Sequence, residues 1–324
     1  MHQVEIIKKH LFRIGCLIKT SVLAMWKNIY DYCKGNWPTW RIKSERYARL
    51  TRLNKPIGSF LLLWPTYWGL WIAAEGLPDM HILVVFTLGV ILMRSAGCVL
   101  NDIADSKLDK QVERTRTRPI ATGEVRTSEA LIVAFLIILI AFLLVLTMNL
   151  LTIKLAFVAV FLAAVYPFMK RYTYMPQFVL GLAFGWSIPM AFAAQTNSIP
   201  NIAWVLLIAN VLWSVAYDTM YAMVDREDDL KAGVKSTAIL FDDADRIIIA
   251  IIQLMVMVTL VLAGQHVGMD WIYYIALIIA YGFFIYQLTL IWQRQPNKCF
   301  NAFLNNNCFG LTVFLGIMIN YLLE

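Results

Sequence analysis

The sequence NDIADSKLDKQVERTRTRPIATG runs from Asn101 to Gly123 and directly follows a long apolar segment. Asp102, Asp105 and Asp109 are spaced by three and four residues, so a helix would place all three on one face. Carboxylates crowded in this way repel one another unless a cation lies between them. Oxygen ligands of this kind favour Mg²⁺, which takes its other ligands from water and substrate phosphates. This first acidic motif therefore predicts a magnesium site at the end of a membrane helix, with Asn101 as a neutral ligand.

Three arginines, Arg114, Arg116 and Arg118, come immediately after the first acidic motif. Guanidinium groups bind phosphate oxygens in pairs, as a diphosphate site requires. A solvated charged loop is the alternative interpretation. However, acidic residues beside an apolar membrane segment are unfavourable and usually mark a functional site.

A second acidic motif, DTMYAMVDREDD, begins at Asp218, and its residues Asp218, Asp225 and Asp229 again share a helical spacing. Fourteen of the 21 acidic residues in the chain lie in the windows 101–129 and 218–245. Two acid-rich helix ends that face each other, each able to hold Mg²⁺, would bind a diphosphate between them. The motifs follow the second and sixth predicted spans, which is consistent with an internal duplication.

The composition is that of a membrane protein. Of 324 residues, 60% are hydrophobic, and the mean hydropathy is +0.65, whereas soluble domains are nearer half apolar. A run of about 20 apolar residues spans a bilayer as a helix, and no stretch shows the alternation of a strand. We therefore expect an all-α polytopic protein. The nine spans are predicted at 56–75, 81–100, 129–148, 150–168, 176–195, 201–217, 245–264, 271–292 and 301–323.

The net charge of +7 is distributed very unevenly. The first 55 residues carry twelve lysines and arginines and the segment 101–128 carries six, whereas the predicted loops of the opposite side carry only Lys154. The positive-inside rule then places the N-terminus and both acidic motifs in the cytoplasm. The positive charge is explained by this topology, so no nucleic-acid partner is expected.

Residues 1–50 are basic and only mildly apolar, with apolar side chains at helical spacing. This pattern is typical of an amphipathic helix on an anionic membrane surface. We expect this segment at 1–50 and a transmembrane domain at 51–324. A mitochondrial targeting segment is the alternative for the N-terminus, so a bacterial inner membrane is the preferred location and the mitochondrial inner membrane the other.

Two further basic residues lie near predicted helix ends. Arg94 precedes Asn101 by seven residues, or roughly 10 Å along a helix, and Lys55 lies at the mouth of the first span. Arg94 must face a cavity, pair with an acid or extend to the surface. We expect both side chains to bind substrate.

Several motifs along the chain resemble one family. NDIADSKLD followed by RTRTRP is similar to the first aspartate motif of the UbiA superfamily of intramembrane prenyltransferases, and YDTMYAMVDREDD is similar to the second. Within that superfamily the chain resembles the 4-hydroxybenzoate polyprenyltransferases, although Asn54 stands where aspartate is expected. The supporting motifs are RLNKPIGSFLLLWPTYWGLW at 52–71, MRSAGCVLND at 93–102, YPFMKRYT at 166–173, GWSIPMAFAA at 185–194 and KSTAILF at 235–241.

The resemblance implies nine transmembrane helices around a central, lipid-accessible cavity, with both acidic motifs at its cytoplasmic end. It also implies Mg²⁺-dependent transfer of a polyprenyl group from polyprenyl diphosphate to the ring carbon ortho to the hydroxyl of 4-hydroxybenzoate, in ubiquinone biosynthesis. The metal would neutralise the charge on the leaving diphosphate. The expected catalytic metal ligands are Asp102, Asp105, Asp109, Asp225 and Asp229.

Cationic side chains would assist at the diphosphate. The candidates are Arg118, Lys170, Arg171 and Lys235, with Asn101 and Asp218 also at the substrate. Lys170 and Arg171 end the fourth span, where a headgroup anchor is the structural alternative. The YPFMKRYT motif favours a catalytic role for Arg171, which could hold either the benzoate carboxylate or the diphosphate.

Three other interpretations compete with this one. Prenyl transfer to a naphthoate or to haem would use the same acidic motifs. A cation-coupled transporter would tend to place its charges near the middle of the bilayer, at broken helices, whereas these acids lie at span ends beside arginines. A structural scaffold gives no reason for two acidic motifs.

Overall fold

The structure, a computed structural model, describes residues 43–110 and 112–323. The chain divides into two units, Met1–Ala48 and Arg49–Glu324, and all of the helices named below belong to the second. The amphipathic helix expected within residues 1–50 falls almost wholly outside the described residues.

Nine helical segments of the described part are long and apolar enough to cross a membrane, and no strand occurs there. This confirms the all-α polytopic class. The helices are α2 (Ile57–Ala74), α3 (Met80–Ala104), α4 (Thr127–Val145), α5 (Leu150–Tyr172), α6 (Pro176–Gly185), α7 (Ser187–Thr196), α8 (Asn201–Ala222), α9 (Arg226–Ala232), α10 (Thr237–Phe241), α11 (Asp245–His266), α12 (Trp271–Ile291) and α13 (Pro296–Leu323). α6 and α7 together form one span, and α10, the 3-10 turn η1 (Asp242–Ala244) and α11 form another.

Three helices run further than their apolar sequence predicts. α3 continues to Ala104, α5 to Tyr172 and α8 to Ala222, whereas the apolar runs end four or five residues earlier. An apolar run ends where the hydrocarbon ends, but the backbone hydrogen bonds of a helix can continue for another turn. These extra turns carry polar residues of both acidic motifs.

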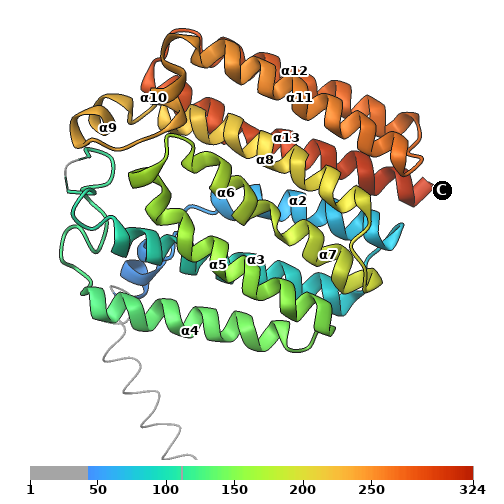
Figure 1. Cartoon of the computed structure of the whole chain (residues 1–324), viewed down its shortest axis with the longest axis horizontal. Coiled ribbons are helices and arrows are strands. Elements are labelled where there is room, and N and C mark those ends of the chain that lie inside the picture. Colours follow the sequence, from blue (N-terminus) through green and yellow to red (C-terminus); the bar gives the residue numbers. More distant parts are fainter. Residues whose placement is uncertain (1–42, 111, 324) are drawn as a thin grey trace, which may run out of the picture. The chain divides into compact units, whose positions relative to one another are not determined.

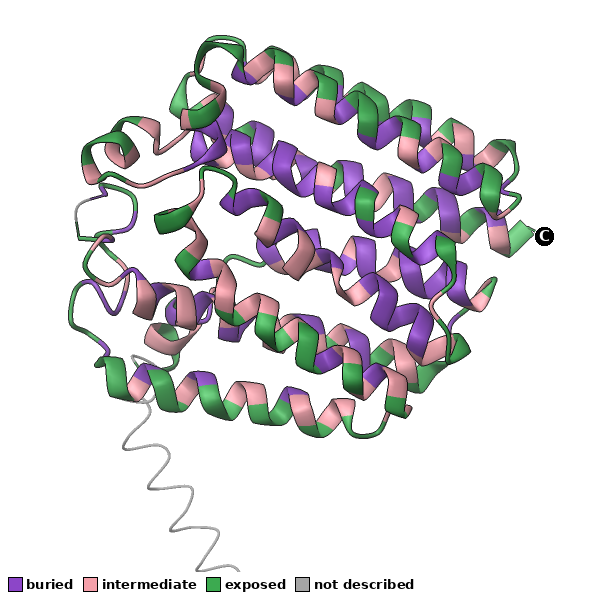
Figure 2. Cartoon of the chain, in the orientation of Figure 1, coloured by how far each residue is buried: buried purple, intermediate pink, exposed green. Residues whose placement is uncertain are grey.

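α8 is the core of the bundle. Figure 1 shows it crossing the middle, and Figure 2 shows that its residues are mostly buried while α4 is largely exposed. Trp213 of α8 stacks on Trp68 of α2 with ring centroids 5.4 Å apart. Its indole N–H donates to Asn306 Oδ1 at 2.8 Å, and that of Trp68 donates to the Gly310 carbonyl at 3.1 Å. These bonds satisfy the polar edge of each ring, since a membrane interior offers no water.

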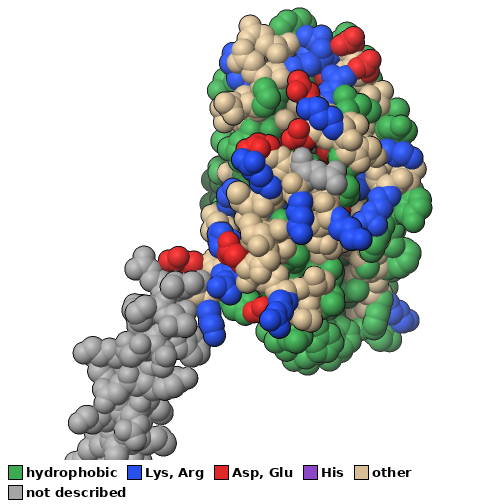
Figure 3. Space-filling model, turned by 90° about the vertical axis from the view of Figure 1, so that its left-hand side faces the viewer, with side chains coloured by type: hydrophobic (Ala, Val, Ile, Leu, Met, Phe, Trp, Pro, Cys, Tyr) green, Lys and Arg blue, Asp and Glu red, His purple; other side chains and the backbone are tan. Residues whose placement is uncertain are grey.

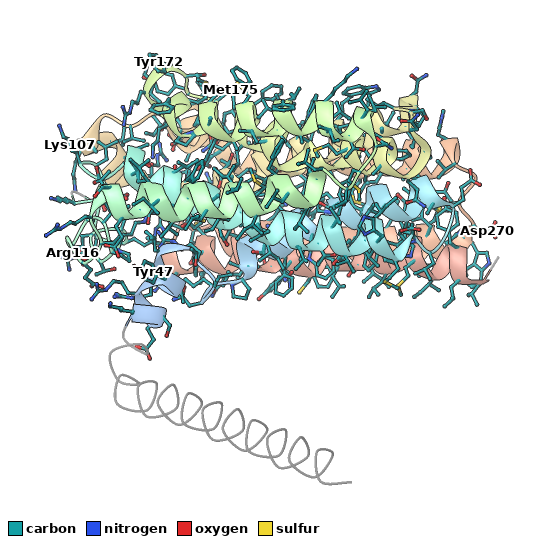
Figure 4. The ribbon with its side chains drawn as sticks, turned by 90° about the horizontal axis from the view of Figure 1, so that it is seen from below. Tyr47, Lys107, Arg116, Tyr172, Met175 and Asp270 are labelled. Carbon is teal, nitrogen blue, oxygen red and sulfur yellow. The ribbon has the colours of Figure 1, made fainter. Side chains whose placement is uncertain are left out.

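Both acidic motifs lie at the same end of the bundle. Figure 1 places α9 and the segment between α3 and α4 at one end. Lys107 and Arg116 lie at that end in Figure 4, and Asp270 lies at the opposite end. The fold therefore joins two sequence regions that are separated by four spans.

A buried ion pair fixes this end. Asp245, the first residue of α11, is completely buried. Arg294, between α12 and α13, donates to both Asp245 oxygens at 2.9 Å and to Asp243 at 3.1 Å. Arg226 of α9 pairs with Asp242 and lies 4.0 Å from Asp245. The network thereby connects α9, which carries part of the second acidic motif, to the rest of the bundle.

Replacing Arg294 by alanine should destabilise the protein by about 3 kcal/mol, because it leaves a buried carboxylate without its close partner. Thermal unfolding in a mild detergent measures the effect. The control is Arg116→Ala, which removes an exposed pair with Glu113 and should change stability by less than about 1 kcal/mol. Equal melting temperatures for the two variants would contradict a structural role for Asp245.

Candidate active site

A cavity of about 160 Å³ opens between the two acidic motifs. Its walls come from α3, the α3–α4 segment, α5, α6, α8, α9 and the residues before α10. Figure 3 faces this end of the bundle and shows lysine and arginine side chains gathered over it. The sequence-predicted residues that line the cavity are Asn101, Asp105, Asp109, Arg118, Lys170, Asp218, Asp225, Asp229 and Lys235.

The first acidic motif does not form one unbroken helical face. α3 ends at Ala104, so Asp105 and Asp109 follow the helix and do not share one continuous helical face with Asp102. Helix-like turns nevertheless continue: the Asp105 N–H donates to the Asn101 carbonyl at 2.9 Å, and the Asp109 N–H donates to the Asp105 carbonyl at 2.8 Å. These two bonds leave both carboxylates on the cavity wall.

Asp102 lies behind the wall rather than on it, and it is buried. Arg52 donates to its two oxygens at 2.9 and 3.0 Å, and Arg118 lies 3.0 Å away. Arg118 also donates to both oxygens of Asp109 at 2.9 and 3.0 Å. Asp102 thus positions two guanidinium groups beside the cavity.

One carboxylate oxygen of Asp105 has no hydrogen-bond partner in the described part of the chain. Its Oδ2 pairs with Lys170 of α5, while its buried Oδ1 has no hydrogen-bond partner among the described residues. A buried carboxylate oxygen without a partner is costly. Its position on the cavity wall suits a cation bound in the cavity.

The second acidic motif repeats this local arrangement. α8 ends at Ala222, Asp225 caps α9, and the Asp229 N–H donates to the Asp225 carbonyl at 2.8 Å. Arg114 donates from Nε to Asp225 at 2.9 and 3.1 Å and also contacts the Tyr221 hydroxyl. Burial, together with the neighbouring charge of Asp225, raises the pKa of Asp229 to about 7.

Three predicted substrate residues lie outside the cavity wall. Lys55 is exposed. Arg171 is also exposed and donates to the Ala104 carbonyl at 2.7 Å, at the end of α3. Arg94 lies in α3 with its Cζ 5.6 Å from the centroid of the Phe184 ring, and it has no ion pair or hydrogen bond with any described residue.

The cavity also contains residues that the sequence analysis did not select. Tyr221 lies three residues after Asp218 and four before Asp225, so helical spacing could have identified it. Arg114, by contrast, belongs to the basic run that the sequence predicts for phosphate binding, and it lines the cavity. No local pattern identifies Gln177, which reaches the wall through the packing of α6. Other polar residues of the wall that were not predicted are Thr115, Tyr166 and Ser236, and Arg52 lies behind the wall.

The oxygen donors of the cavity fit a hard divalent cation by their chemistry. In the described residues, however, no three acidic, histidine or cysteine side chains are gathered in a metal-binding arrangement. The carboxylates are paired with basic side chains instead. A metal and a diphosphate arriving together would supply partners for both kinds of charge.

Comparisons with known proteins agree with these features. Residues 62–312 match the UbiA prenyltransferase family. The chain is 59% identical over 284 residues to the 4-hydroxybenzoate octaprenyltransferase of Saccharophagus degradans, which covers 86% of this chain and 93% of the relative. It is 55% identical over 282 residues to the enzyme of that name from Photobacterium profundum, covering 87% and 98%.

Solved structures show the same fold. The apo UbiA homologue of Aeropyrum pernix has a TM-score of 0.72 at 20% identity, covering 81% of this chain and 97% of that one. A UbiA homologue from Archaeoglobus fulgidus bound to GPP and Mg²⁺ has a TM-score of 0.65 at 16% identity, covering 84% and 99%. Together with the sequence matches, they establish that this multi-pass membrane protein belongs to the UbiA prenyltransferase family.

Proposed function

We propose that this protein transfers a polyprenyl group from its diphosphate to the ring carbon ortho to the hydroxyl of 4-hydroxybenzoate. The observation that carries the proposal is the meeting of two acidic motifs and their basic partners at one cavity. The relatives' names identify the acceptor, and they make octaprenyl diphosphate the first donor to test. The product would enter ubiquinone biosynthesis.

Mg²⁺ is the proposed cofactor. Asp105 and Asp109 of the first motif and Asp225 and Asp229 of the second would hold it, because these four carboxylates line the cavity. When bound, the metal neutralises the charge on the diphosphate leaving group. Asp102 would contribute through Arg118, which lines the cavity, while Arg52 pairs with Asp102 behind the wall.

The basic side chains of the cavity would bind the diphosphate oxygens. Arg114, Arg118 and Lys170 each pair with a motif carboxylate, and Lys235 also lines the wall. When a diphosphate binds together with its cation, the ion pairs within the cavity would be exchanged for new contacts. The carboxylates would bind the metal, and the basic groups would bind the phosphate oxygens. The exchange keeps every charge compensated, which matters because the carboxylates of Asp105 and Asp109 are buried.

Arg94 is our candidate for the acceptor carboxylate. It lies in a membrane-spanning helix, where a guanidinium without an anionic partner is unfavourable. The carboxylate of Asp218 attracts it electrostatically, but no carboxylate of the described residues forms an ion pair or a hydrogen bond with it. A benzoate carboxylate could accept two parallel hydrogen bonds from it. The seven-residue rise from Arg94 to Asn101, roughly 10 Å along the helix, would separate the carboxylate from the diphosphate. The ring could lie between them.

We place the protein in a bacterial inner membrane with this cavity on the cytoplasmic side. The bacterial origin of the relatives and the basic residues gathered at the cavity end support this orientation.

Replacing Asp105 or Asp225 by alanine should lower prenyl transfer about 100-fold or more, because each removes charge that the metal and diphosphate need. The assay uses purified protein, octaprenyl diphosphate, labelled 4-hydroxybenzoate and Mg²⁺, and EDTA should abolish product formation. Asp270→Ala, at the opposite end of the bundle, is the control that should retain activity.

Unchanged activity in Asp105→Ala and Asp225→Ala would contradict the proposal. Product from a different aromatic acceptor alone would retain the metal site and change the substrate. Folded protein without transfer to any acceptor would favour cation-coupled transport instead.

Divalent-cation binding should weaken about tenfold as the pH falls from 8 to 6. A carboxylate must lose its proton to bind a metal, and the pKa of Asp229 is raised to about 7, so protons compete across this range. Titration with Mn²⁺, followed by electron paramagnetic resonance, measures the affinity. Asp229→Asn should bind more weakly and show little of this pH dependence. A wild-type affinity that is constant between pH 6 and 8 would show that no ligand of the metal titrates in this range, which contradicts metal binding by an Asp229 with a raised pKa.

Replacing Arg94 by alanine should raise the apparent KM for 4-hydroxybenzoate roughly 30-fold or more, because the carboxylate loses a charged partner. The KM for octaprenyl diphosphate should not change. An equal rise in both constants would show that Arg94 acts on the fold or on the diphosphate rather than on the acceptor.

A further inference from the structure

Gly58, the second residue of α2, is buried against the guanidinium of Arg94. A Cβ atom placed on Gly58 would lie 2.4 Å from Nε, 2.5 Å from Nη2 and 2.8 Å from Cζ of Arg94. Carbon and nitrogen atoms that are not bonded do not approach this closely. The position of Arg94 therefore requires that residue 58 has no side chain.

The guanidinium has an aromatic contact as well. Phe184 of α6 lies with its ring centroid 5.6 Å from Arg94 Cζ, within the range of a cation–π interaction. The Phe184 ring packs against a small apolar cluster of Leu62, Leu63 and Val90. Arg94 is thus positioned by the α2 backbone at Gly58 and by a ring that the cluster holds in place.

Gly58 differs from the glycines that let helices pack closely. Gly181 faces the Val211 backbone, with a Cβ–Cα distance of 3.0 Å, and Gly69 faces the Ile188 backbone at 3.3 Å. At those two positions a methyl group would push two helices apart. At Gly58 it would meet the end of a flexible charged side chain instead. The space at Gly58 therefore serves the placement of Arg94 rather than the approach of α2 to α3.

We propose that Gly58 is a specificity-determining position for the acceptor: it fixes the Arg94 guanidinium where it can bind the acceptor's carboxylate. This inference rests on the proposed function, in which Arg94 binds 4-hydroxybenzoate. Gly58 is a positioning residue, since it acts through Arg94 and not on the substrate. A displaced guanidinium would lose the alignment needed for two parallel hydrogen bonds to a carboxylate.

Gly58→Ala tests this inference. The methyl group should displace the guanidinium without disturbing the helix, so the melting temperature should match that of the control. The apparent KM for 4-hydroxybenzoate should rise about tenfold, because a misplacement of about 1 Å is enough for an effect of this size. The KM values for octaprenyl diphosphate and Mg²⁺ should stay as in the wild type. Gly89→Ala is the matched control, since a Cβ at Gly89 of α3 meets nothing within 4 Å.

Two additional measurements distinguish the positioning of Arg94 by Gly58 from a general effect of the added methyl group on helix packing. In an Arg94→Ala background, Gly58→Ala should cause no further loss of labelled 4-hydroxybenzoate binding. The wild-type preference for 4-hydroxybenzoate over its uncharged amide should also shrink in Gly58→Ala. Additive losses in the double variant, or an unchanged preference for the charged acceptor, would overturn the inference.

Activity of the wild type distinguishes an incorrect role for Gly58 from an incorrect proposed function. If the wild type prenylates 4-hydroxybenzoate and Gly58→Ala behaves like Gly89→Ala, only the role of Gly58 is wrong. If the wild type neither binds nor prenylates 4-hydroxybenzoate, the proposed function is wrong and the inference fails with it.

Discussion

The cavity end of this protein depends on one requirement. Each carboxylate at the edge of the apolar bundle needs a positively charged partner. Asp102 is held by Arg52 and Arg118, Asp105 by Lys170, and Asp225 by Arg114. Without these partners the carboxylates would carry a large desolvation cost. The basic residues come from the segment before α2, from the α3–α4 segment and from α5, so the same ion pairs also hold distant parts of the chain together around the cavity.

The two acidic motifs share one local design. In each, a long membrane helix ends three residues or fewer before an aspartate, Asp105 or Asp225, and the N–H of the aspartate four residues later donates to its carbonyl at 2.8 Å. The arrangement directs two carboxylates per motif toward the cavity. The likeness of the two motifs is consistent with the internal duplication that the sequence suggests.

The sequence predicts the parts of this structure that depend on local pattern. Apolar run length identifies the nine spans found in the described part of the chain, and the spacing of the aspartates identifies the five carboxylates that line the cavity. Contacts made only by packing are not predictable in this way: nothing near Arg52 indicates that it pairs with Asp102. Lys170 and Arg171 are another case in which the sequence alone does not identify the cavity residue. Adjacent helical residues point about 100° apart, so only one can face the cavity, and the packing of α5 selects Lys170.

Locating a bound metal would test directly, without an activity assay, whether the two acidic motifs bind a divalent cation together. Crystals of the protein with Mn²⁺ and a non-reactive octaprenyl diphosphate analogue would reveal the metal by anomalous X-ray scattering. Mn²⁺ bound by Asp105 of the first motif and by Asp225 or Asp229 of the second, with the analogue's phosphates against Arg114, Arg118 or Lys170, is the predicted result. A cavity without Mn²⁺, or Mn²⁺ held only by residues outside the two acidic motifs, would contradict it.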